Sequence, residues 1–329
     1  MVTVKDQGAA VGFTCSNELH ESKTAAACNQ SGACDIMEKQ CKRKGRTVRV
    51  ALKFEVIGRK SAPMELRYDW RKLALYALSV GANVDGELEY VYEKNMKIIP
   101  TYWAAILGFK TFTDAYEYGQ SLPDTLHYGF EIEYHKPITS VEGKITYSVE
   151  LLDIYDRGLG RGSLAFIQAE AFDEQGDKAF TLLTKDIDMS TGGFGGKKPP
   201  NVTVEYPKRA PDFVVDDHIG PNQAALYRID NDPNILHIDP DFAALGGFDR
   251  PILMGMCTAG YACRALIKAV CPGRPEAIRS LSVRFTSALE PNRPVQTQIW
   301  KMDDRQIVFR LIDLTTGDAV LNFCTARIE

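Results

Sequence analysis

Apolar and polar positions along the chain follow two periods from residue 48 onward. Stretches that alternate with period two, as strands with one buried face do, are interspersed with amphipathic stretches of helical spacing. Strands follow helices in both halves of the chain, which predicts an α+β fold with antiparallel sheets. The alternating stretches are 130–138, 147–156 and 163–172 in the first half, and 279–285, 297–300, 306–312 and 319–328 in the second.

An internal repeat organises this pattern. The tripeptide Ala-Leu-Tyr at 74–76 recurs at 225–227, and the same offset of 151 residues places Asn83 on Asn234. Each copy is predicted to contain a long helix wrapped by a curved antiparallel sheet. The two halves can then pair sheet to sheet within one chain.

A second helix is predicted in each copy, opened by Pro100 in the first and by Pro251 in the second. Proline suits the first turn of a helix, where its missing N–H would be unsatisfied anyway. In the second copy this helix is predicted over 251–270. Its small residues are Gly255, Ala259, Gly260 and Ala262. They keep one side of the helix thin, which favours close packing on a sheet.

Two glycine-rich stretches are interpreted as connections. The run at 157–162 lies between two predicted strands and indicates a hairpin turn, because a dinucleotide loop needs a strand before it and a helix after it. The run at 192–198 lacks the Ser/Thr and the context of a phosphate-binding loop, and marks the start of an interdomain linker. The predicted organisation is a poorly ordered extension at 1–47, a first domain at 48–196, a linker at 197–221 and a second domain at 222–329.

Composition excludes several classes of protein. The chain has 329 residues, is 45% hydrophobic and carries a net charge of −4, which gives no indication of nucleic-acid binding. No apolar run approaches the roughly 20 residues that cross a bilayer, and no signal peptide opens the chain. The eight cysteines follow no zinc-like spacing and indicate reduced thiols inside a cell.

The densest polar chemistry lies in "DNDPNILHIDP" at 230–240. A calcium loop is disfavoured because Ile235 stands where an EF-hand needs Gly, and Asp241 stands where it needs Glu. A transition-metal site is disfavoured because no second histidine lies nearby at ligand spacing. An acid/base pair of Asp232 and His237 remains open, as does a purely structural role for either.

Structural alternatives apply to each residue. Asp232 is of a type that caps helices and forms turns, and a lone loop histidine is often structural. Arg228 is interpreted as a partner for a carboxylate in the fold, and Asp239-Pro240 as a turn that positions the loop. The repeat favours chemistry, because Asp232 falls on Gly81 and His237 on Gly86 of the first copy. A site present in one copy is expected to work once per chain.

With these residues identified, the chain resembles the type 2 (MaoC-like) enoyl-CoA hydratases, a double-hot-dog family that also forms a domain of peroxisomal multifunctional enzymes. The resemblance covers about residues 48–329. It rests on "YRIDNDPNILHIDP" at 227–240 and "FAALGGFDRPILMGMC" at 242–257, with further similar segments "ALYALSVGA", "GGFGGKK", "RAPD" and "NQAALYR".

The resemblance implies roles for particular residues. Asp232 and His237 fall on the catalytic pair, Asn234 on a supporting residue, and Gly255 on the backbone N–H that binds the oxyanion. The first half is then non-catalytic and accommodates the acyl chain. No metal and no cofactor are expected, since coenzyme A belongs to the substrate. Lys208, Arg209 and Arg250 are candidate contacts for its phosphates, with a solvated surface as the alternative.

The implied activity is that of a lyase, the reversible hydration of trans-2-enoyl-CoA to (3R)-3-hydroxyacyl-CoA in fatty-acid metabolism. Partners are then an acyl-CoA thioester and a second copy of the chain in a homodimer, with no nucleic acid and no membrane. The family implies a peroxisomal location. The final residues "ARIE" are not a Ser-Lys-Leu-type address, so the cytoplasm is the alternative.

The chain also departs from the family pattern. Asp230-Asn231 replaces Ser-Gly, Ile235 replaces Pro, Met254 replaces His, and Asn292 stands where Gly is usual. These changes put the geometry of the loop in question. Two alternatives therefore stay open, a thioesterase on the same fold and an acyl-CoA-binding protein without turnover.

Overall fold

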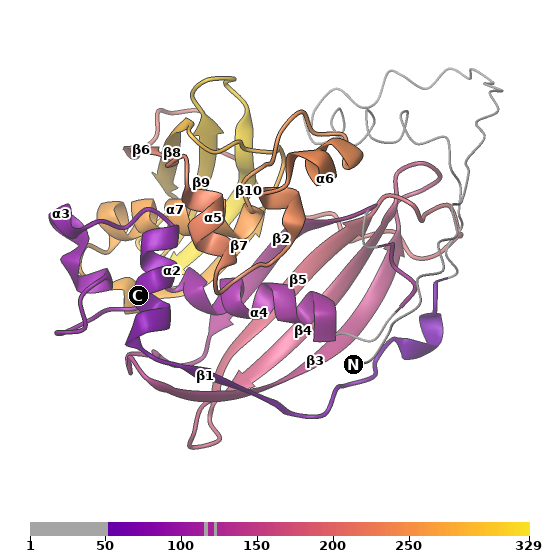
Figure 1. Cartoon of the computed structure of the whole chain (residues 1–329), viewed down its shortest axis with the longest axis horizontal. Coiled ribbons are helices and arrows are strands. Elements are labelled where there is room, and N and C mark those ends of the chain that lie inside the picture. Colours follow the sequence, from indigo (N-terminus) through magenta and orange to yellow (C-terminus); the bar gives the residue numbers. More distant parts are fainter. Residues whose placement is uncertain (1–51, 115–117, 122–123) are drawn as a thin grey trace, which may run out of the picture.

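The structure, a computed structural model, describes residues 52–114, 118–121 and 124–329 (Figure 1). The extension predicted at 1–47 lies outside the described residues. The strands form one antiparallel sheet of ten, in the order β1-β3-β4-β5-β2-β7-β10-β9-β8-β6. In the first half these are β1 (Met64–Tyr68), β2 (Thr125–Tyr134), β3 (Gly143–Asp156), β4 (Ser163–Phe172) and β5 (Lys178–Asp188). In the second half they are β6 (Phe213–His218), β7 (Ile278–Arg284), β8 (Pro294–Lys301), β9 (Gln306–Asp313) and β10 (Ala319–Ile328).

Helices cover one face of this sheet, with α4 across the first half and α7 across the second (Figure 1). The α-helices are α2 (Trp70–Ser79), α3 (Val84–Glu87), α4 (Thr101–Asp114), α5 (Gln223–Arg228), α6 (Pro240–Leu245) and α7 (Gly255–Val270). Short 3-10 turns are η1 (Phe54–Val56), η2 (Leu88–Tyr90), η4 (Ile235–His237) and η5 (Pro275–Ala277). The α+β fold of two hot-dog repeats is thus confirmed. No helix among the described residues has the length and apolar character needed to span a bilayer.

The two halves join edge to edge through β2 and β7. Glu131 of β2 lies opposite Ser282 of β7, and these two residues are 151 positions apart. Equivalent residues therefore face each other across the seam, which places the axis relating the halves between these two strands. The sequence predicted that the two halves pair sheet to sheet and left open whether by faces or by edges. The observed contact continues the hydrogen-bond ladder from one half into the other, which satisfies both edges.

The second long helix begins later than predicted. It starts at Gly255, whereas Pro251 lies four residues earlier in extended chain. The backbone of this segment has partners elsewhere, since Leu253 N–H donates to Leu289 O at 2.7 Å and Ile252 O accepts from His237. In the first half, by contrast, α4 begins directly after Pro100. The small side of α7 does allow close packing, but at Gly260 the neighbour is the end of α2 and not the predicted sheet, since an added Cβ would lie 2.4 Å from Val80 Cγ1.

Asp156 organises both glycine-rich connections. The run at 157–162 turns the chain from β3 into β4, as predicted. The buried carboxylate of Asp156 accepts hydrogen bonds from Gly158 N (2.8 Å), Gly193 N (2.7 Å) and Gly195 N (2.7 Å). Burial opposes ionisation of this carboxyl, but the backbone donors outweigh it and lower its pKa. In the second glycine-rich stretch, the amides of Gly193 and Gly195 therefore already donate to the Asp156 carboxylate.

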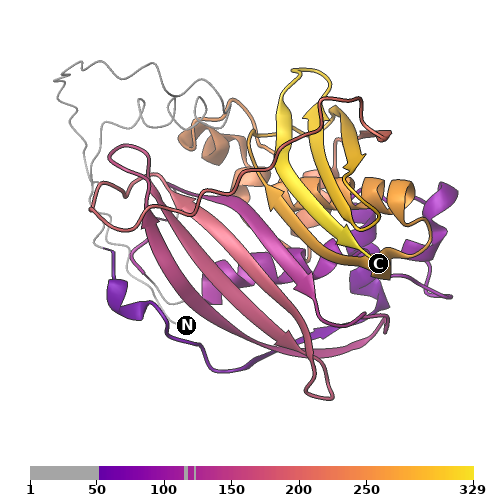
Figure 2. The ribbon, with the colours of Figure 1, turned by 180° about the vertical axis from the view of Figure 1, so that it is seen from behind.

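The linker predicted at 197–221 contains a strand. Residues 213–218 form β6, which pairs with β8 at the edge of the second half. The polar residues of β6 hid this strand, because an edge strand with an exposed face lacks the alternation of a buried one. The segment before β6 crosses the back of the sheet (Figure 2), where Tyr206 donates to Phe309 O and accepts from Phe323 N–H.

A buried ion pair ties the halves together. Arg264 of α7 donates from Nε to Glu87 Oε1 at 2.9 Å and from Nη1 to Val80 O at 2.9 Å, both in the first half. Its Nη1 also donates to Asp217 of β6 at 2.9 Å. Desolvation opposes ionisation of Glu87, but the Arg264 guanidinium outweighs it and lowers the pKa of the carboxyl.

Candidate active site

The segment 230–240 is held at both ends by helices. It leaves α5 at Arg228, forms the η4 turn at Ile235–His237 and enters α6 at Pro240. Asn234 caps η4, since its Oδ1 accepts from Leu236 N at 3.0 Å. Asp239 caps α6 by accepting from Asp241 N at 2.8 Å and Phe242 N at 3.0 Å, which confirms its predicted positioning role.

Asp232 and His237 face each other within this segment. His237 Nε2 lies 3.8 Å from Asp232 Oδ2, and the two side chains are 9% and 22% exposed. Asp232 Oδ1 accepts from Asn234 N at 3.0 Å, which orients the carboxylate. The separation is too long for a direct hydrogen bond and short enough for one water to reach both atoms at about 2.8 Å. The five-residue spacing in sequence thus becomes a pair that converges on one point.

The tautomer of His237 follows from its second contact. His237 Nδ1 lies 2.8 Å from Ile252 O. A carbonyl only accepts, so Nδ1 carries the proton and Nε2 keeps its lone pair in the neutral ring. Burial lowers the pKa of His237, while Asp232 and the Ile252 carbonyl oppose part of that shift. His237 is therefore a neutral imidazole at pH 7 with a basic nitrogen directed toward Asp232.

Helix α7 begins beside this pair with free backbone donors. Its N-cap is Met254, which makes no side-chain hydrogen bond to the first turn. The first N–H groups of a helix lack partners within the helix and attract negative charge. Gly255 packs tightly, because an added Cβ would lie 3.0 Å from the ring of Phe285 and the ring would have to shift. Met254 stands where the family pattern has a histidine, and its side chain is buried in the hydrophobic core.

The three carboxylates of the segment point to separate partners. Asp230 lies 3.6 Å from Lys72 Nζ of α2, Asp232 faces His237, and Asp239 caps α6. Within the described ranges, no three His, Cys, Asp or Glu side chains gather as metal ligands would. The carboxylate partner predicted for Arg228 is not found among the described residues, and Arg228 donates to Pro233 O at 3.3 Å across the loop. The segment is therefore organised as a turn around one Asp/His pair.

The equivalent segment of the first half has no room for the carboxylate of such a pair. Asn83 again precedes a helical turn, as Asn234 does, which confirms the equivalence of the two loops. At Gly81, the counterpart of Asp232, an added Cβ would lie 2.5 Å from the ring of Tyr261. A side chain of α7 thus occupies the space where the first half would need its carboxylate.

The three candidate phosphate contacts, Lys208, Arg209 and Arg250, lie in two separate parts of the fold. Arg209 donates to Asp212 Oδ1 (2.5 Å) and Lys301 O (2.7 Å) beside β6 and β8. In the part of the chain that the structure describes, neither it nor the exposed Lys208 contacts Asp232, His237 or Gly255. Arg250 adjoins the segment that accepts from His237, is 68% exposed, and lies 3.7 Å from Glu290. Arg250 is thus the predicted cation next to the site.

Sequence reasoning missed a polar pair in the first half, His127 of β2 and Asp186 of β5. They lie opposite each other in the sheet. Asp186 had a detectable signal, because it shares the face of the buried Leu182 and Thr184 in an alternating strand. His127 had none, since a bulge between His127 and Gly129 changes the face on which it lies.

This fold and this site define a class of protein, a double hot dog with one Asp/His pair beside the start of its second helix. Comparison with known proteins supports the class. A family model for a MaoC-like domain matches residues 202–322, and one for the MFE-2 hydratase 2 N-terminal domain matches residues 66–184. The MaoC-like dehydratase of Phytophthora capsici superposes with a TM-score of 0.74 at 28% identity, over 83% of this chain and 97% of its own.

Curated relatives agree with the family models. The 3-hydroxyacyl-thioester dehydratase Y of Mycobacterium tuberculosis is 34% identical over 77% of this chain and 89% of its own length. The peroxisomal enoyl-CoA hydratase 2 of Arabidopsis thaliana is 32% identical over 71% of this chain and 82% of its own. The chain therefore belongs to the MaoC-like dehydratase family, with a hydratase 2 N-terminal domain in its first half.

Proposed function

We propose that this protein catalyses the reversible hydration of trans-2-enoyl-CoA to (3R)-3-hydroxyacyl-CoA in fatty-acid metabolism. The observation that carries the proposal is the convergence of His237 Nε2 and Asp232 Oδ2, 3.8 Å apart, beside the uncapped start of α7. The names of the relatives, a 3-hydroxyacyl-thioester dehydratase and an enoyl-CoA hydratase 2, support this reaction class.

Two acceptor atoms suit the activation of one water. Water donates one O–H to Nε2 and the other to Oδ2, which directs an oxygen lone pair at C3 of the enoyl group. As the C3–O bond forms, His237 takes the proton, and Asp232 stabilises the imidazolium. Positioned acid/base groups of this kind contribute about 10²–10⁴-fold each.

The electrons displaced from the double bond move to the thioester oxygen. The N–H of Gly255, at a helix start, can donate to that oxyanion, which is worth roughly 3–4 kcal/mol for a well-placed donor. The enolate then collapses as His237 returns its proton to C2. Water has thereby supplied a hydroxyl to C3 and a proton to C2, and the base is regenerated. Asn234 supports this chemistry by fixing the η4 turn that carries His237.

A turnover assay with trans-2-butenoyl-CoA and trans-2-octenoyl-CoA tests the proposal. We expect loss of the conjugated enoyl absorbance and formation of the (3R)-alcohol, analysed by chiral chromatography. Release of free coenzyme A without a hydroxyacyl product would favour a thioesterase. Tight binding with neither product would favour an acyl-CoA-binding protein, and either result would overturn the hydratase.

Assembly and location are proposed on the same basis. We propose an enzyme that works inside the cell as a homodimer, with a peroxisomal location as in the named Arabidopsis relative and the cytoplasm as the alternative. The linker, the two domains and the acyl-accommodating role of the first half belong to the same proposal. Light scattering and fluorescence microscopy of the tagged protein with an organelle marker test assembly and location.

A further inference from the structure

Among the described residues of the first half, several buried polar side-chain atoms have no hydrogen-bond partner, and three of them are His127 Nε2, Asp186 Oδ2 and Tyr118 Oη. Leaving a buried donor or acceptor unpaired costs about 1–3 kcal/mol, more if charged. Burial raises the pKa of Asp186 to about 7 and lowers that of His127 to about 4, so neither holds a stable charge there. Such atoms call for a partner that the protein itself does not supply.

The three groups share one place in the fold. His127 and Asp186 are direct cross-strand partners, which puts their Cβ atoms about 4.5–5.5 Å apart. The bulge after His127 aims its ring to the helix-covered face, together with Asp186. Tyr118 follows α4, and three residues further on Ser121 N–H donates to Asp188 Oδ2 at 2.8 Å, which ties this segment to the end of β5, two residues from Asp186. Burial and, to a lesser extent, the charge of Asp186 raise the pKa of the Tyr118 phenol. Bulges next to active sites commonly redirect a side chain in this way.

This cluster adjoins the proposed site. The His127 ring lies 5.3 Å from the ring of Phe285, which in turn packs on Gly255. Between them, α4 presents Gly108, where an added Cβ would lie 2.7 Å from Met256 Cε and 3.7 Å from His127 Cε1. The space between the helix and the strand is thus filled by a glycine and the flexible end of a methionine, which yields easily to a ligand. An acyl chain that leaves Gly255 along this path reaches His127 and Asp186.

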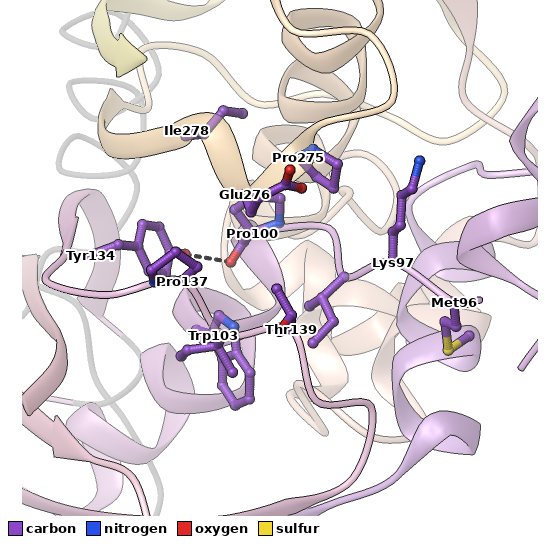
Figure 3. A pocket seen from close by; sticks show the side chains of 12 residues that line it. Met96, Lys97, Pro100, Trp103, Tyr134, Pro137, Thr139, Pro275, Glu276 and Ile278 are labelled. Atoms are coloured by element: carbon purple, nitrogen blue, oxygen red, sulfur yellow. Dashed lines mark hydrogen bonds between the residues drawn. The ribbon is translucent and has the colours of Figure 1, made fainter. Parts of the chain in front are cut away.

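The position equivalent to His127 in the second half is apolar. His127 corresponds to Ile278 across the repeat, and the residue opposite Ile278 is Ile328, at the same bulge. The equivalent place at the other end of the seam, around Ile278, carries a pocket of about 70 Å³ (Figure 3). Ile278, Trp103 and Tyr134 line it, and Tyr134 donates to Pro100 O at 2.5 Å. In the second half, Ile278 and Ile328 therefore occupy the positions that His127 and Asp186 occupy in the first half.

We propose that His127, Asp186 and Tyr118 recognise a hydroxyl group on the acyl chain, so that the enzyme prefers hydroxylated enoyl-CoA over the plain hydrocarbon chain. A hydroxyl donates to His127 Nε2 and accepts from Tyr118 or from the protonated Asp186 carboxyl. A ketone fits less well, because it offers no donor to His127 Nε2. This inference rests on the proposed hydratase function and names its substrate class.

The test uses the full chain and matched thioesters. Saturated octanoyl-CoA and a series of octanoyl-CoA molecules hydroxylated at successive carbons from C5 to C8 are titrated by calorimetry, which needs no turnover. We expect one hydroxylated member to bind about tenfold or more tightly than octanoyl-CoA, as one buried hydrogen bond predicts. The corresponding trans-2-enoyl-CoA pair should show a similar ratio in kcat/KM.

The double variant His127→Ile/Asp186→Ile installs the pair found in the other half, which tolerates it at the same bulge. It should remove or invert the preference for the hydroxylated chain, and thermal denaturation reports whether it folds. If it does not fold, Tyr118→Phe serves, with an expected loss of a few-fold in the same ratio. Equal binding of plain and hydroxylated chains by the unaltered protein would overturn the proposal. A binding preference without hydration of any enoyl-CoA would overturn the proposed function and leave this recognition standing.

Discussion

The two halves of the molecule keep the same sheet and differ in what their loops and sheet ends carry. Both have a long helix over an antiparallel sheet, with Asn83 and Asn234 preceding equivalent turns. The second half adds a carboxylate and an imidazole to its loop, whereas the first has glycine at both positions. The difference teaches that two copies of one sheet and helix frame can carry different polar groups in the same loop.

The halves have also become dependent on each other. Tyr261 of α7 fills the space beside Gly81, and Glu87 of the first-half loop binds Arg264 of α7. The residue that the repeat places at the position of Glu87 in the second half is Ile238, which is exposed. The first-half loop thus makes structural contacts with α7 at the positions that differ from the second-half loop.

The largest effect is expected at the site that only the second half has. Asp232→Asn removes an acceptor for the catalytic water, and we expect kcat to fall about 10³-fold in the enoyl-CoA hydration assay. Asp239→Asn is the matched control, because Asp239 lies in the same segment and only caps α6. It should cost about 1 kcal/mol of unfolding free energy and change kcat less than threefold. Equal loss of activity in both variants would contradict the assignment.

The second effect concerns the ion pair between the halves. Glu87→Gln leaves the buried Arg264 guanidinium with one fewer carboxylate, and we expect a loss of about 3 kcal/mol in unfolding free energy by urea denaturation. Glu89→Gln, two residues away in the same loop, should stay within about 0.5 kcal/mol of the unaltered protein. A neutral result for Glu87→Gln would show that the halves do not depend on this contact.

The third effect compares two glycines of the first-half loop. Gly81 has φ of +87° and Gly86 has φ of +91°, a conformation that costs other residues about 1–2 kcal/mol. An added Cβ meets the Tyr261 ring at 2.5 Å at Gly81 and nothing within 4 Å at Gly86. Gly81→Ala should therefore lose about 3 kcal/mol by chemical denaturation and Gly86→Ala about 1 kcal/mol. Similar losses would mean that Tyr261 moves aside freely.

The fourth effect is a pH dependence that belongs to the first half. The folded protein keeps a proton on Asp186 up to a pKa of about 7, whereas the unfolded chain releases it near its ordinary value of about 4. The native state then binds more protons, so this group lowers stability as pH rises from about 4 to 7. Asp186→Asn should gain on the order of 2 kcal/mol over the unaltered protein at pH 8 and much less at pH 4.5, by urea denaturation at each pH.

Asp188 provides the control for that measurement. It lies two residues along β5 and accepts from Ser121 N and Ser190 Oγ at 2.8 and 2.7 Å. Asp188→Asn weakens these bonds, so it should destabilise the protein at pH 8, opposite in sign to Asp186→Asn. Destabilisation by both would show that Asp186 has a partner in solution.

The smallest effect is the acidic limb of the pH–rate profile. Catalysis needs neutral His237, and activity is lost as pH falls through its pKa. Burial lowers that pKa, so the limb should lie below the ordinary histidine value of about 6.5. Between pH 7.5 and 6.5 we expect kcat/KM to change less than twofold. A limb centred above 6.5 would mean that Asp232 outweighs burial.

Much of the fold followed from local pattern. Seven strands and the turn at 157–162 were predictable because apolar alternation and glycine placement are local signals. The edge strand β6 and the start of α7 were not, since tertiary partners decide them: β8 for Phe213–His218, and Leu289 and His237 for the segment before Gly255. The edge-to-edge joining of the halves likewise depends on contacts between distant residues.

The candidate pair could be named from the sequence, but its chemistry could not. The repeat singled out Asp232 and His237 through their absence from the first half. The tautomer of His237 needed the Ile252 carbonyl, which lies 15 residues away and meets the ring only in the folded chain. His127 was out of reach, because a one-residue bulge decides which face this strand residue occupies, whereas Asp186 could have been found from the alternation of β5.

The seam between β2 and β7 bears on stoichiometry. If the halves were separate chains with similar edges, random pairing would give mixed dimers in only about half of the cases. Covalent linkage turns that pairing into an intramolecular event, at an effective concentration far above that of two free polypeptides. Every molecule then has one half with the Asp232/His237 pair and one half without it, at any level of expression. Fusion thereby let the halves diverge without producing unproductive pairs.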